Sequence, residues 1–406
     1  MHPQPLEFFA RVRAARNTFT GDVIEAGSLD MNGSGMDEVF ADATSHEGVD
    51  WRAGKNVSVV AVFHEYETER RFDTALCTEM AEHDPFWRLS LAKMVELLKP
   101  GGNLFFSCAA RARPVHEKHV GIDMHYQGLD LVDVLAELRK VGSFREIIAV
   151  QNIAPADTYI AALGKRSDAG TAPGLSVVIP ACQSRFVPHC LSTHWTLSTG
   201  DTEFIVVANG MLRQDEDELL SLPVTPAILA LYDVNLGFPG ACNVGIQMRH
   251  PQAKAVALVN DDTEALVYHW DRRVLDILAG EPDVGALSPV TNFVANPYQQ
   301  HGIMPTPELY DVPLMFFVWV ALPVRTIDSV GLLDERYGLG NYEDVDYSIR
   351  LRIARLRMVV DPIHAVHHHG HGTFGTLPDG QFQALLRNAE AVLRSKWGAQ
   401  LTEFLG

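Results

Sequence analysis

The apolar run of residues 255–259 is followed by Asn260 and then by two adjacent carboxylates, Asp261 and Asp262. Hard divalent cations prefer carboxylate ligands, and in many sites such a cation also binds phosphate oxygens. The same pair can also form a solvated turn whose acids cap the next helix. The segment therefore supports two interpretations, a metal site that carries a diphosphate or a helix cap.

A second acidic group, Glu343, Asp344 and Asp346, opens a helical pattern. Apolar residues recur there at spacings of four, four and three, at Val345, Ile349, Ile353 and Leu356. This spacing places them on one face of a helix that begins near Glu343. Acids in a first turn are favoured by the helix dipole, but three exceed what capping needs. One of them could act as a general base toward a hydroxyl group.

Four histidines occur within five residues of the stretch VHHHGHGTFG, residues 366–375. Neutral imidazole is a common metal ligand and titrates near neutral pH. The alternative is a polar surface loop.

Short apolar runs alternate with amphipathic stretches along the whole chain. The runs are DVIEAG, FDTALC, NLFFSCAA, TYIAALG, LSVVIP, EFIVVANG, AILALYDV and KAVALVN. Such alternation predicts parallel sheets covered by helices, and ligands of these sheets bind beyond the carboxyl ends of the strands. We therefore expect two α/β domains in series, residues 1–164 and 175–376. A Gly/Pro-containing linker, 165–174, joins them, and a helical tail, 377–406, follows.

Composition limits the classes of function. The 406 residues are 47% hydrophobic and carry a net charge of −18, which disfavours nucleic acid as a partner. The five cysteines are scattered, as free thiols in a reducing compartment would be. The longest apolar run, 312–324, is too short to cross a bilayer, and the N-terminus lacks the apolar core of a signal peptide. We expect a cytoplasmic protein without a transmembrane segment.

In their order along the chain, the motifs of the second half resemble a family-2 glycosyltransferase of the GT-A fold. The matching stretches span about residues 173–376: LSVVIPA, EFIVVANG, NLGFPGACNVGI, LVNDDTEAL, GLLDERYGLGNYEDVDYSIRLR and the histidine run. The resemblance implies a nucleotide-sugar donor, a sugar or glycan acceptor and Mn²⁺ or Mg²⁺. It also implies inversion at the anomeric carbon as the usual outcome.

The resemblance also assigns roles to residues. Asp344 matches the base that deprotonates the acceptor hydroxyl, and Glu343 orients this base or the acceptor. The implied metal ligands are Asp262, Asp261 and either His367 or His368. The implied nucleotide-sugar-binding residues are Pro180, Ala181, Asn209, Asn235, Gly237, Gly240, Asn243 and Asn260. Relatives often have an acid that reads the nucleoside at the position of Ala208, so the donor base stays open.

The first half has a strand, VIEAG, that runs into a loop with Gly27, Gly33 and Gly35. Such loops permit close approach of a nucleotide-like ligand or simply form a tight turn. Over residues 19–164 the chain resembles a class I S-adenosylmethionine-dependent methyltransferase. The implied cofactor-binding residues are Glu25, Gly27, Ser28, Gly33, Asp50, Glu79 and His83. One departure is Val62, near which relatives often have an acid that contacts adenine.

Together these features predict a two-domain enzyme that transfers a sugar, with methylation of the same product by its first domain as the first hypothesis. In the second hypothesis the first domain is a non-catalytic acceptor-binding or assembly module. In the third, the whole chain is a binding or scaffold protein. A loop with four polar residues either lines the acceptor pocket or is an ordinary polar loop: His116, His119, Asp123 and His125. The sequence does not give the oligomeric state.

Overall fold

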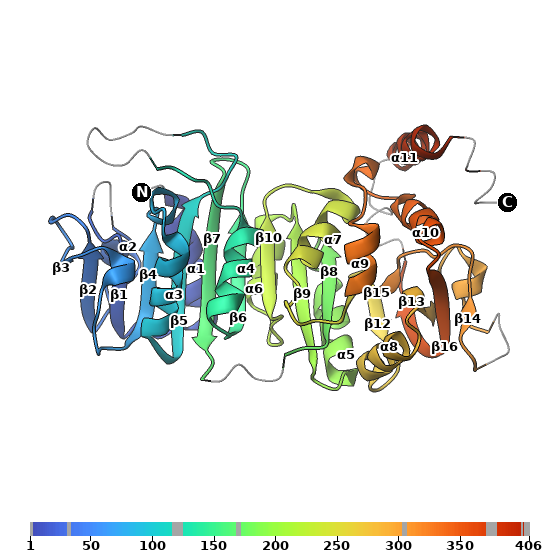
Figure 1. Ribbon diagram of the computed structural model, residues 1–406, viewed down its shortest axis with the longest axis horizontal. Coiled ribbons are helices and arrows are strands. Elements are labelled where there is room, and N and C mark those ends of the chain that lie inside the picture. The colour runs from blue at the N-terminus through green and yellow to red at the C-terminus, as the bar shows by residue number, and fades with distance from the viewer. Residues whose placement is uncertain are drawn as a thin grey trace. The chain divides into compact units, whose positions relative to one another are not determined.

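The chain folds into two compact units in a computed structural model that describes residues 3–30, 34–115, 125–167, 172–302, 307–370, 380–398 and 401 (Figure 1). Unit 1 comprises residues 1–170 and 227–233, and unit 2 comprises 171–226 and 234–406. Each unit has a sheet flanked by helices, so the predicted α/β class is confirmed. Among the described residues, no helix combines the length and the apolar character that a membrane span requires.

The sheet of unit 1 has the order β3-β2-β1-β4-β5-β7-β6-β10. Neighbours among the first five are parallel, whereas β7 runs antiparallel to both β5 and β6. The strands are β1 (Asp22–Ala26), β2 (Ser45–Asp50), β3 (Val59–Val60), β4 (Phe72–Thr78), β5 (Leu98–Ala109), β6 (Phe144–Gln151), β7 (Asp157–Lys165) and β10 (Ile228–Tyr232). The helices are α1 (Pro3–Arg16), α2 (Gly35–Glu38), α3 (Trp87–Leu97) and α4 (Leu131–Val141), with 3-10 turns Phe63–Glu65 and Ala81–His83.

The strand order of unit 1 reverses direction between β1 and β4. In open parallel sheets, ligands bind at such a switch point, outside the carboxyl ends of the strands. Gly27 follows β1, Asp50 ends β2 and Glu79 follows β4. The fold therefore brings these three predicted residues to the same edge of the sheet.

Strand β10 is formed by the predicted run AILALYDV, but it belongs to unit 1. It pairs in parallel with β6, from Ile228 opposite Ile147 to Tyr232 opposite Gln151. The carboxylate of Asp233 then accepts a hydrogen bond of 3.0 Å from the backbone N–H of Ile153. The chain thus leaves unit 2 after residue 226, contributes one strand to unit 1 and returns at residue 234.

The sheet of unit 2 has the order β12-β16-β13-β15-β11-β8-β9, and β14 pairs with β16. Strands β11, β8 and β9 are parallel neighbours, and β13 is parallel to β16, whereas β15, β12 and β14 pair antiparallel. The strands are β8 (Leu175–Ala181), β9 (Thr202–Asn209), β11 (Ala255–Val259), β12 (Thr263–Ala265), β13 (Val284–Thr291), β14 (Tyr310–Asp311), β15 (Trp319–Pro323) and β16 (Arg357–His368).

The helices of unit 2 include the two that the sequence predicts near its C-terminus, α10 and α11. The bounds are α5 (Val187–Leu197), α6 (Arg213–Leu220), α7 (Gly237–Gln247), α8 (Trp270–Gly280), α9 (Val324–Val330), α10 (Glu343–Ile353) and α11 (Gln381–Trp397), with 3-10 turns Pro297–Gln299 and Glu335–Tyr337. Every residue of β8 and β9 is buried, as expected of strands covered on both faces. Helix α7 packs directly on β8, because a Cβ at Gly245 would lie only 2.2 Å from Val178.

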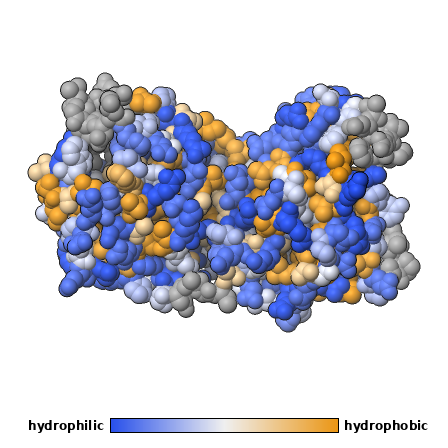
Figure 2. Space-filling view, in the orientation of Figure 1, coloured by the Kyte–Doolittle hydropathy of each residue, from blue (hydrophilic) through white to orange (hydrophobic). Residues whose placement is uncertain are grey.

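The space-filling view shows hydrophilic residues over much of the visible surface of both units, with apolar residues scattered between them (Figure 2). The large aromatic side chains are mostly inside, and in unit 2 they include Trp270, Trp319 and Tyr347. Among the buried polar residues, several lie near the ends of strands, where a ligand-binding site is expected.

Candidate functional site

Asp262 and His368 face each other at one end of unit 2. Strand β12 pairs antiparallel with β16, which sets Thr263 opposite His368. His368 Nε2 lies 3.2 Å from Asp262 Oδ1, and both side chains are about nine-tenths buried. Burial alone would lower the pKa of His368, but the carboxylate of Asp262 and the carbonyl of Phe293 outweigh it and raise that pKa.

The other imidazole nitrogen fixes the orientation of the His368 ring. Nδ1 lies 2.6 Å from the carbonyl oxygen of Phe293, to which it can donate. Asn292 accepts from the backbone N–H of His368 at 2.7 Å and donates to its carbonyl at 3.1 Å. A ring held this way directs Nε2 toward Asp262, as metal-binding histidines usually are held. The pair therefore fits a divalent cation.

Two side chains alone do not complete a coordination shell. Within the described part of the chain, no three His, Cys, Asp or Glu side chains form a group that could hold a metal ion. Mg²⁺ and similar ions commonly keep water and phosphate oxygens as their remaining ligands. Asp262 and His368 would therefore hold a cation together with a phosphate-bearing ligand.

Asp261 and Asn260 lie next to this pair. Burial, and then the neighbouring Asp262 carboxylate, raise the pKa of Asp261 to about 7. The Oδ1 atom of Asn260 is buried and has no hydrogen-bond partner within the described residues. An acid that is readily neutral and an amide with a free acceptor are both available to a ligand at the end of β11.

The remaining histidines of the run lie elsewhere. Residues alternate between the two faces of a strand, so His367 points away from the side that His368 occupies. Its ring instead lies 4.8 Å from that of His369, which pairs with Glu264. Glu264 also pairs with His189 at 2.9 Å, and His371 lies outside the described residues. His369 reaches Asp262 only through its backbone N–H, which donates to the Asp262 carbonyl at 3.0 Å, whereas the His368 ring faces the Asp262 carboxylate.

The second acidic group lies in the first turn of α10, as the periodicity predicts. Asn341 and Tyr342 both adopt left-handed backbone conformations, with φ of 77° and 68°. Such conformations are uncommon outside glycine and often mark functional sites. They direct the chain so that Glu343 is buried and Asp344 is half-buried.

Glu343 and Asp344 are coupled acids. Burial raises the pKa of Glu343 well above its usual range, and the charge of Asp344 raises it further. Burial also raises the pKa of Asp344, to about 6. Two neighbouring carboxyl groups with separated pKa values can divide the roles of ionised base and neutral hydrogen-bond donor. The Oε2 atom of Glu343 has no partner among the described residues, so it is available to a ligand.

One short segment, Phe317–Val318, connects the two acidic groups. The carbonyl of Val318 accepts a 3.0 Å hydrogen bond from the backbone N–H of Asn260. The Asp344 carboxylate accepts a 2.7 Å hydrogen bond from the backbone N–H of Val345, and the backbone of Phe317 lies close enough to it to lower the pKa of this carboxyl group further, against the effect of burial. Adjacent residues of one segment therefore contact the exit of β11 and the start of α10. The cation pair and the acid pair belong to a single region of unit 2.

The residues predicted to bind the nucleotide-sugar divide into two groups. Asn209 ends β9, and its side chain donates to Asn235 Oδ1 at 3.1 Å and accepts from the backbone N–H of Leu236 at 2.6 Å. Asn235 also accepts from the N–H of Gly237 at 2.8 Å. This interlocked pair shapes the turn that leads into α7, beside the buried ends of β8 at Pro180 and Ala181.

The other group has structural partners. Asn243 donates to the carbonyl of Leu333 at 2.9 Å and to Glu335 at 2.8 Å. Gly237 has a φ of 75°, and a Cβ there would lie 1.9 Å from the carbonyl oxygen of Gly338. A Cβ at Gly240 would meet Leu236 at 3.0 Å. These residues hold α7 against the loop that precedes α10. Their contacts are therefore structural, and they fix the position of that loop.

Sequence reasoning missed several residues that shape this region. Asn292 and Phe293 orient His368, and Phe317 contacts Asp344. No motif marks them, because they act mainly through backbone groups and lie 27 to 76 residues from their partners. The one available signal was Asn341, since asparagine tolerates the left-handed conformation better than most residues.

In unit 1 the predicted cofactor-binding acids are already bound within the chain. Glu25 is buried and pairs with His46 Nε2 at 2.9 Å. Asp50 accepts hydrogen bonds from the backbone N–H groups of Arg52, at 2.9 Å, and Leu29, at 3.4 Å. Both carboxylates thus already have partners within the chain, although an ionised carboxylate can accept further hydrogen bonds.

The turn after β1 is also covered. A Cβ at Gly27 would lie 2.5 Å from the side chain of Met80, and a Cβ at Gly48 would lie 2.6 Å from Ser28 Oγ. Lys55 bridges Asp30, at 2.6 Å, and another acid in α2, and so ties two loops together. The predicted Gly33 lies outside the described residues. Within the described residues, Met80 and Ser28 thus pack closely against the turn in which the predicted cofactor-binding glycines lie.

Glu79 and His83 follow β4 at the same edge of the sheet. Glu79 accepts from Ser107 and from Arg113 Nη1, both at 2.9 Å, and Arg113 also pairs with buried Asp157 at 2.6 Å. The His83 ring lies against Tyr126. Of the polar loop considered for an acceptor, His116, His119 and Asp123 lie outside the described residues.

No protein-family model matches the chain, and no curated protein matches it. Solved structures do. GalNAc-T7 with UDP, GalNAc and Mn²⁺ is 13% identical over 51% of this chain and 45% of its own length, with a TM-score of 0.41. The chain therefore covers less than half of that protein. Staphylococcus aureus TarS 1-349 is 13% identical over 57% of this chain and 74% of its own, with a TM-score of 0.38.

The N-methyltransferase NodS from Bradyrhizobium japonicum WM9, in complex with S-adenosyl-L-homocysteine, is 16% identical over 41% of this chain and 87% of its own, with a TM-score of 0.31. The chain is thus similar to two GT-A-type glycosyltransferases and to a methyltransferase, the two fold classes that its motifs resemble.

Proposed function

We propose that unit 2 is a metal-dependent glycosyltransferase that moves a sugar from a nucleotide-sugar to a hydroxyl group of a sugar or glycan acceptor. One observation carries the proposal. Phe317 and Val318 contact Asp344 and Asn260, respectively, so a cation-binding pair and a general base belong to the same region of unit 2. The inverting outcome, the identity of the metal and a cytoplasmic role in polysaccharide biosynthesis belong to this proposal as predictions.

Each residue has a distinct task in this proposal. Asp262 and His368 would hold Mn²⁺ or Mg²⁺, which supplies Lewis-acid stabilisation of the leaving diphosphate. Asn260 and Asp261 face the same ligand at the end of β11. The Asn209–Asn235 pair keeps the turn before α7 open to the nucleoside.

Asp344 takes the proton of the acceptor hydroxyl while that oxygen attacks the anomeric carbon. A general base works best with a pKa near the working pH, and burial has moved that of Asp344 toward neutrality. Neutral Glu343 can donate a hydrogen bond to the acceptor. A single displacement from the side opposite the diphosphate inverts the anomeric centre.

Calorimetric titration with a panel of nucleoside diphosphates, with and without Mn²⁺, tests the donor site. We expect one diphosphate to bind only with the metal, and Asp262→Ala and His368→Ala to weaken that binding. His367→Ala is the matched control, because its side chain lies on the other face of β16. Binding that is equal with and without metal would contradict the proposed cation site.

The transfer step needs its own test. Asp344→Asn should lower turnover by about 10²- to 10⁴-fold, the usual contribution of a general base, and leave diphosphate binding unchanged. A variant that keeps full turnover would show that Asp344 is not the base.

For unit 1 we propose a non-catalytic role in acceptor binding or assembly, in preference to methyl transfer. The observations that favour it are the internal pairing of Glu25 and Asp50 and the cover of Met80 over Gly27. Titration with S-adenosylhomocysteine should give no binding. Tight binding, or methylated product formed from S-adenosylmethionine, would restore the prediction of two activities.

A further inference from the structure

Helix α11 lies against α10, the helix whose first turn carries the proposed base. Ala389 and Leu393 of α11 are buried in one apolar cluster with Tyr337, Val345 and Ile349. Val345 and Ile349 belong to α10 and repeat every four residues, as do Ala389 and Leu393 on α11. The two helices therefore pack through matching apolar stripes.

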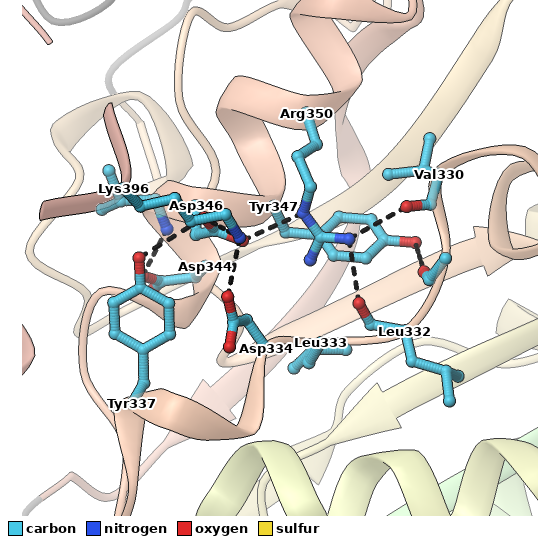
Figure 3. A network of polar contacts seen from close by, with 12 residues as sticks. Val330, Leu332, Leu333, Asp334, Tyr337, Asp344, Asp346, Tyr347, Arg350 and Lys396 are labelled. Atoms are coloured by element: carbon cyan, nitrogen blue, oxygen red, sulfur yellow. Dashed lines mark hydrogen bonds and ion pairs between the residues drawn. The ribbon is translucent and has the colours of Figure 1, made fainter. Parts of the chain in front are cut away.

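Asp346 is the buried centre of a polar network beside this contact (Figure 3). Its carboxylate is fully buried. Oδ1 pairs with Lys396 Nζ at 2.7 Å and accepts from Trp397 Nε1 at 2.8 Å, both from the end of α11. Oδ2 accepts from Arg350 Nε at 2.9 Å, one turn later on α10. Asp346, the third acid of the group at the start of α10, therefore has donors on both oxygens and is not available to substrate.

The network extends to the loop before α10. Lys396 bridges from Asp346 to Asp334, also at 2.7 Å. Arg350 Nη1 donates to the carbonyls of Val330, at 3.0 Å, and Leu332, at 2.9 Å. Figure 3 shows these groups converging around Asp346, with Asp344 beside them. The end of α11, directly, and the loop of residues 330–334, through Lys396 and Arg350, are thus tied to one carboxylate of α10.

We propose that Lys396 and Trp397 are positioning residues of the transferase site, which act through Asp346 to hold the first turn of α10 and so Asp344. The inference rests on the proposed role of Asp344 as base. Asp346 lies two positions after Asp344, so both lie in the same turn. The left-handed residues Asn341 and Tyr342 fix one end of this turn, and the Asp346 network fixes the other.

The energetics favour a rigid attachment. Burial of a carboxylate is unfavourable unless the group is paired, and loss of one partner of a buried pair is strongly destabilising. Asp346 therefore cannot lose Lys396 without the turn changing its position or protonation. Misplacement of a reacting group by about 1 Å can lower a rate by about 10²-fold. Small displacements of this turn should thus affect turnover more than donor binding.

The test uses the full-length protein and conservative variants of α11. Lys396→Met removes the ammonium, and Trp397→Phe removes only the indole N–H donor. Arg394→Gln is the matched control, because the Arg394 side chain is exposed and pairs with Glu390 on its own helix. We expect both changes at the network to lower kcat by about 10-fold with the donor KM unchanged, and the control to match wild type.

Two further measurements separate positioning from general stability. Lys396→Arg, which keeps the charge, should recover most of kcat. In an Asp344→Asn background, Trp397→Phe should cause no further loss, because its effect passes through the base. Unchanged kcat in Lys396→Met and Trp397→Phe, or a full additional loss in the double variant, would overturn the proposal.

Hydrogen exchange distinguishes failure of this inference from failure of the proposed function. In Lys396→Met, backbone amides of residues 343–349 should exchange at least about 10-fold faster than in wild type, whereas Arg394→Gln should leave them unchanged. This readout needs no turnover. If wild type transfers no sugar but exchange accelerates, the proposed function fails while the attachment stands. If exchange is unchanged, the positioning role is wrong.

Discussion

Two buried histidines in unit 2 should make the protein sensitive to mild acid. His364 and His194 are fully buried. Neither nitrogen of His364 has a hydrogen-bond partner in the described part of the chain, and the His364 ring stacks on Trp270 and meets the edge of Trp319. Burial lowers the pKa of His364 to about 3 and that of His194 to about 4, from an ordinary value of 6.5.

The sign and size of the effect follow from these values. The unfolded chain binds a proton at each histidine below pH 6.5, whereas in the folded chain these histidines stay neutral until their lowered pKa values are reached. Stability is therefore complete above this pH and falls as the pH drops through 6.5, until about 4 for His194 and about 3 for His364. At about pH 5 each histidine lowers the free energy of unfolding by about 2 kcal/mol, since one pKa unit corresponds to about 1.4 kcal/mol.

The perturbation that isolates one of them is His364→Phe, which keeps a ring between the two tryptophans but cannot be protonated. Urea unfolding at about pH 8 and about pH 5 gives the loss of unfolding free energy for each protein. We expect the variant to lose about 2 kcal/mol less than wild type over this interval. His301→Phe, at an exposed position, should lose as much as wild type. Equal losses in wild type and His364→Phe would refute the reasoning.

Three further predictions concern the site. Because burial raises the pKa of Asp344 to about 6 and the base must be ionised, kcat should fall about tenfold per pH unit below that value, and a flat pH–rate profile there would contradict the assignment. Gly237→Ala should lower the unfolding free energy of unit 2 by about 1–3 kcal/mol or more. The alanine Cβ would clash with a backbone oxygen, and residue 237 has a positive φ. Gly280→Ala, with open space around it, should be neutral or stabilising by up to about 1 kcal/mol in the same urea titration. Cys182 is the one cysteine that is not buried, so a thiol reagent should label it first, and a nucleoside diphosphate with Mn²⁺ should slow labelling at the end of β8.

The sequence predicts the local elements well because their signals are local. Runs such as LSVVIPA carry the composition of a buried strand, and strand β8 forms there. The period of α10 and its acidic first turn place its beginning at Glu343. Asp50 ends β2 as expected. In each case a few consecutive residues contain the information.

The sequence does not predict features that depend on pairing at a distance. The run AILALYDV has the composition of a buried strand, but nothing in it specifies β6 as its neighbour. His367 and His368 are chemically identical, and only the register of β16 against β12 decides which one meets Asp262. Met80 covers Gly27 through a contact between residues that are 53 positions apart. Such contacts are set by the packing of the whole unit.

The shared strand β10 has a consequence for how the protein is made. While the chain grows from its N-terminus, residues 1–165 can form β1 to β7, but β6 then lacks its parallel neighbour. Its unpaired backbone groups form an exposed edge, which is a site for wrong pairing with other chains. The edge is covered only after residues 228–232 have left the ribosome, in the middle of the synthesis of unit 2. Unit 1 therefore cannot finish folding until part of unit 2 has been synthesised, and a nascent chain that stalls near the linker would expose the unpaired edge of β6 to other chains.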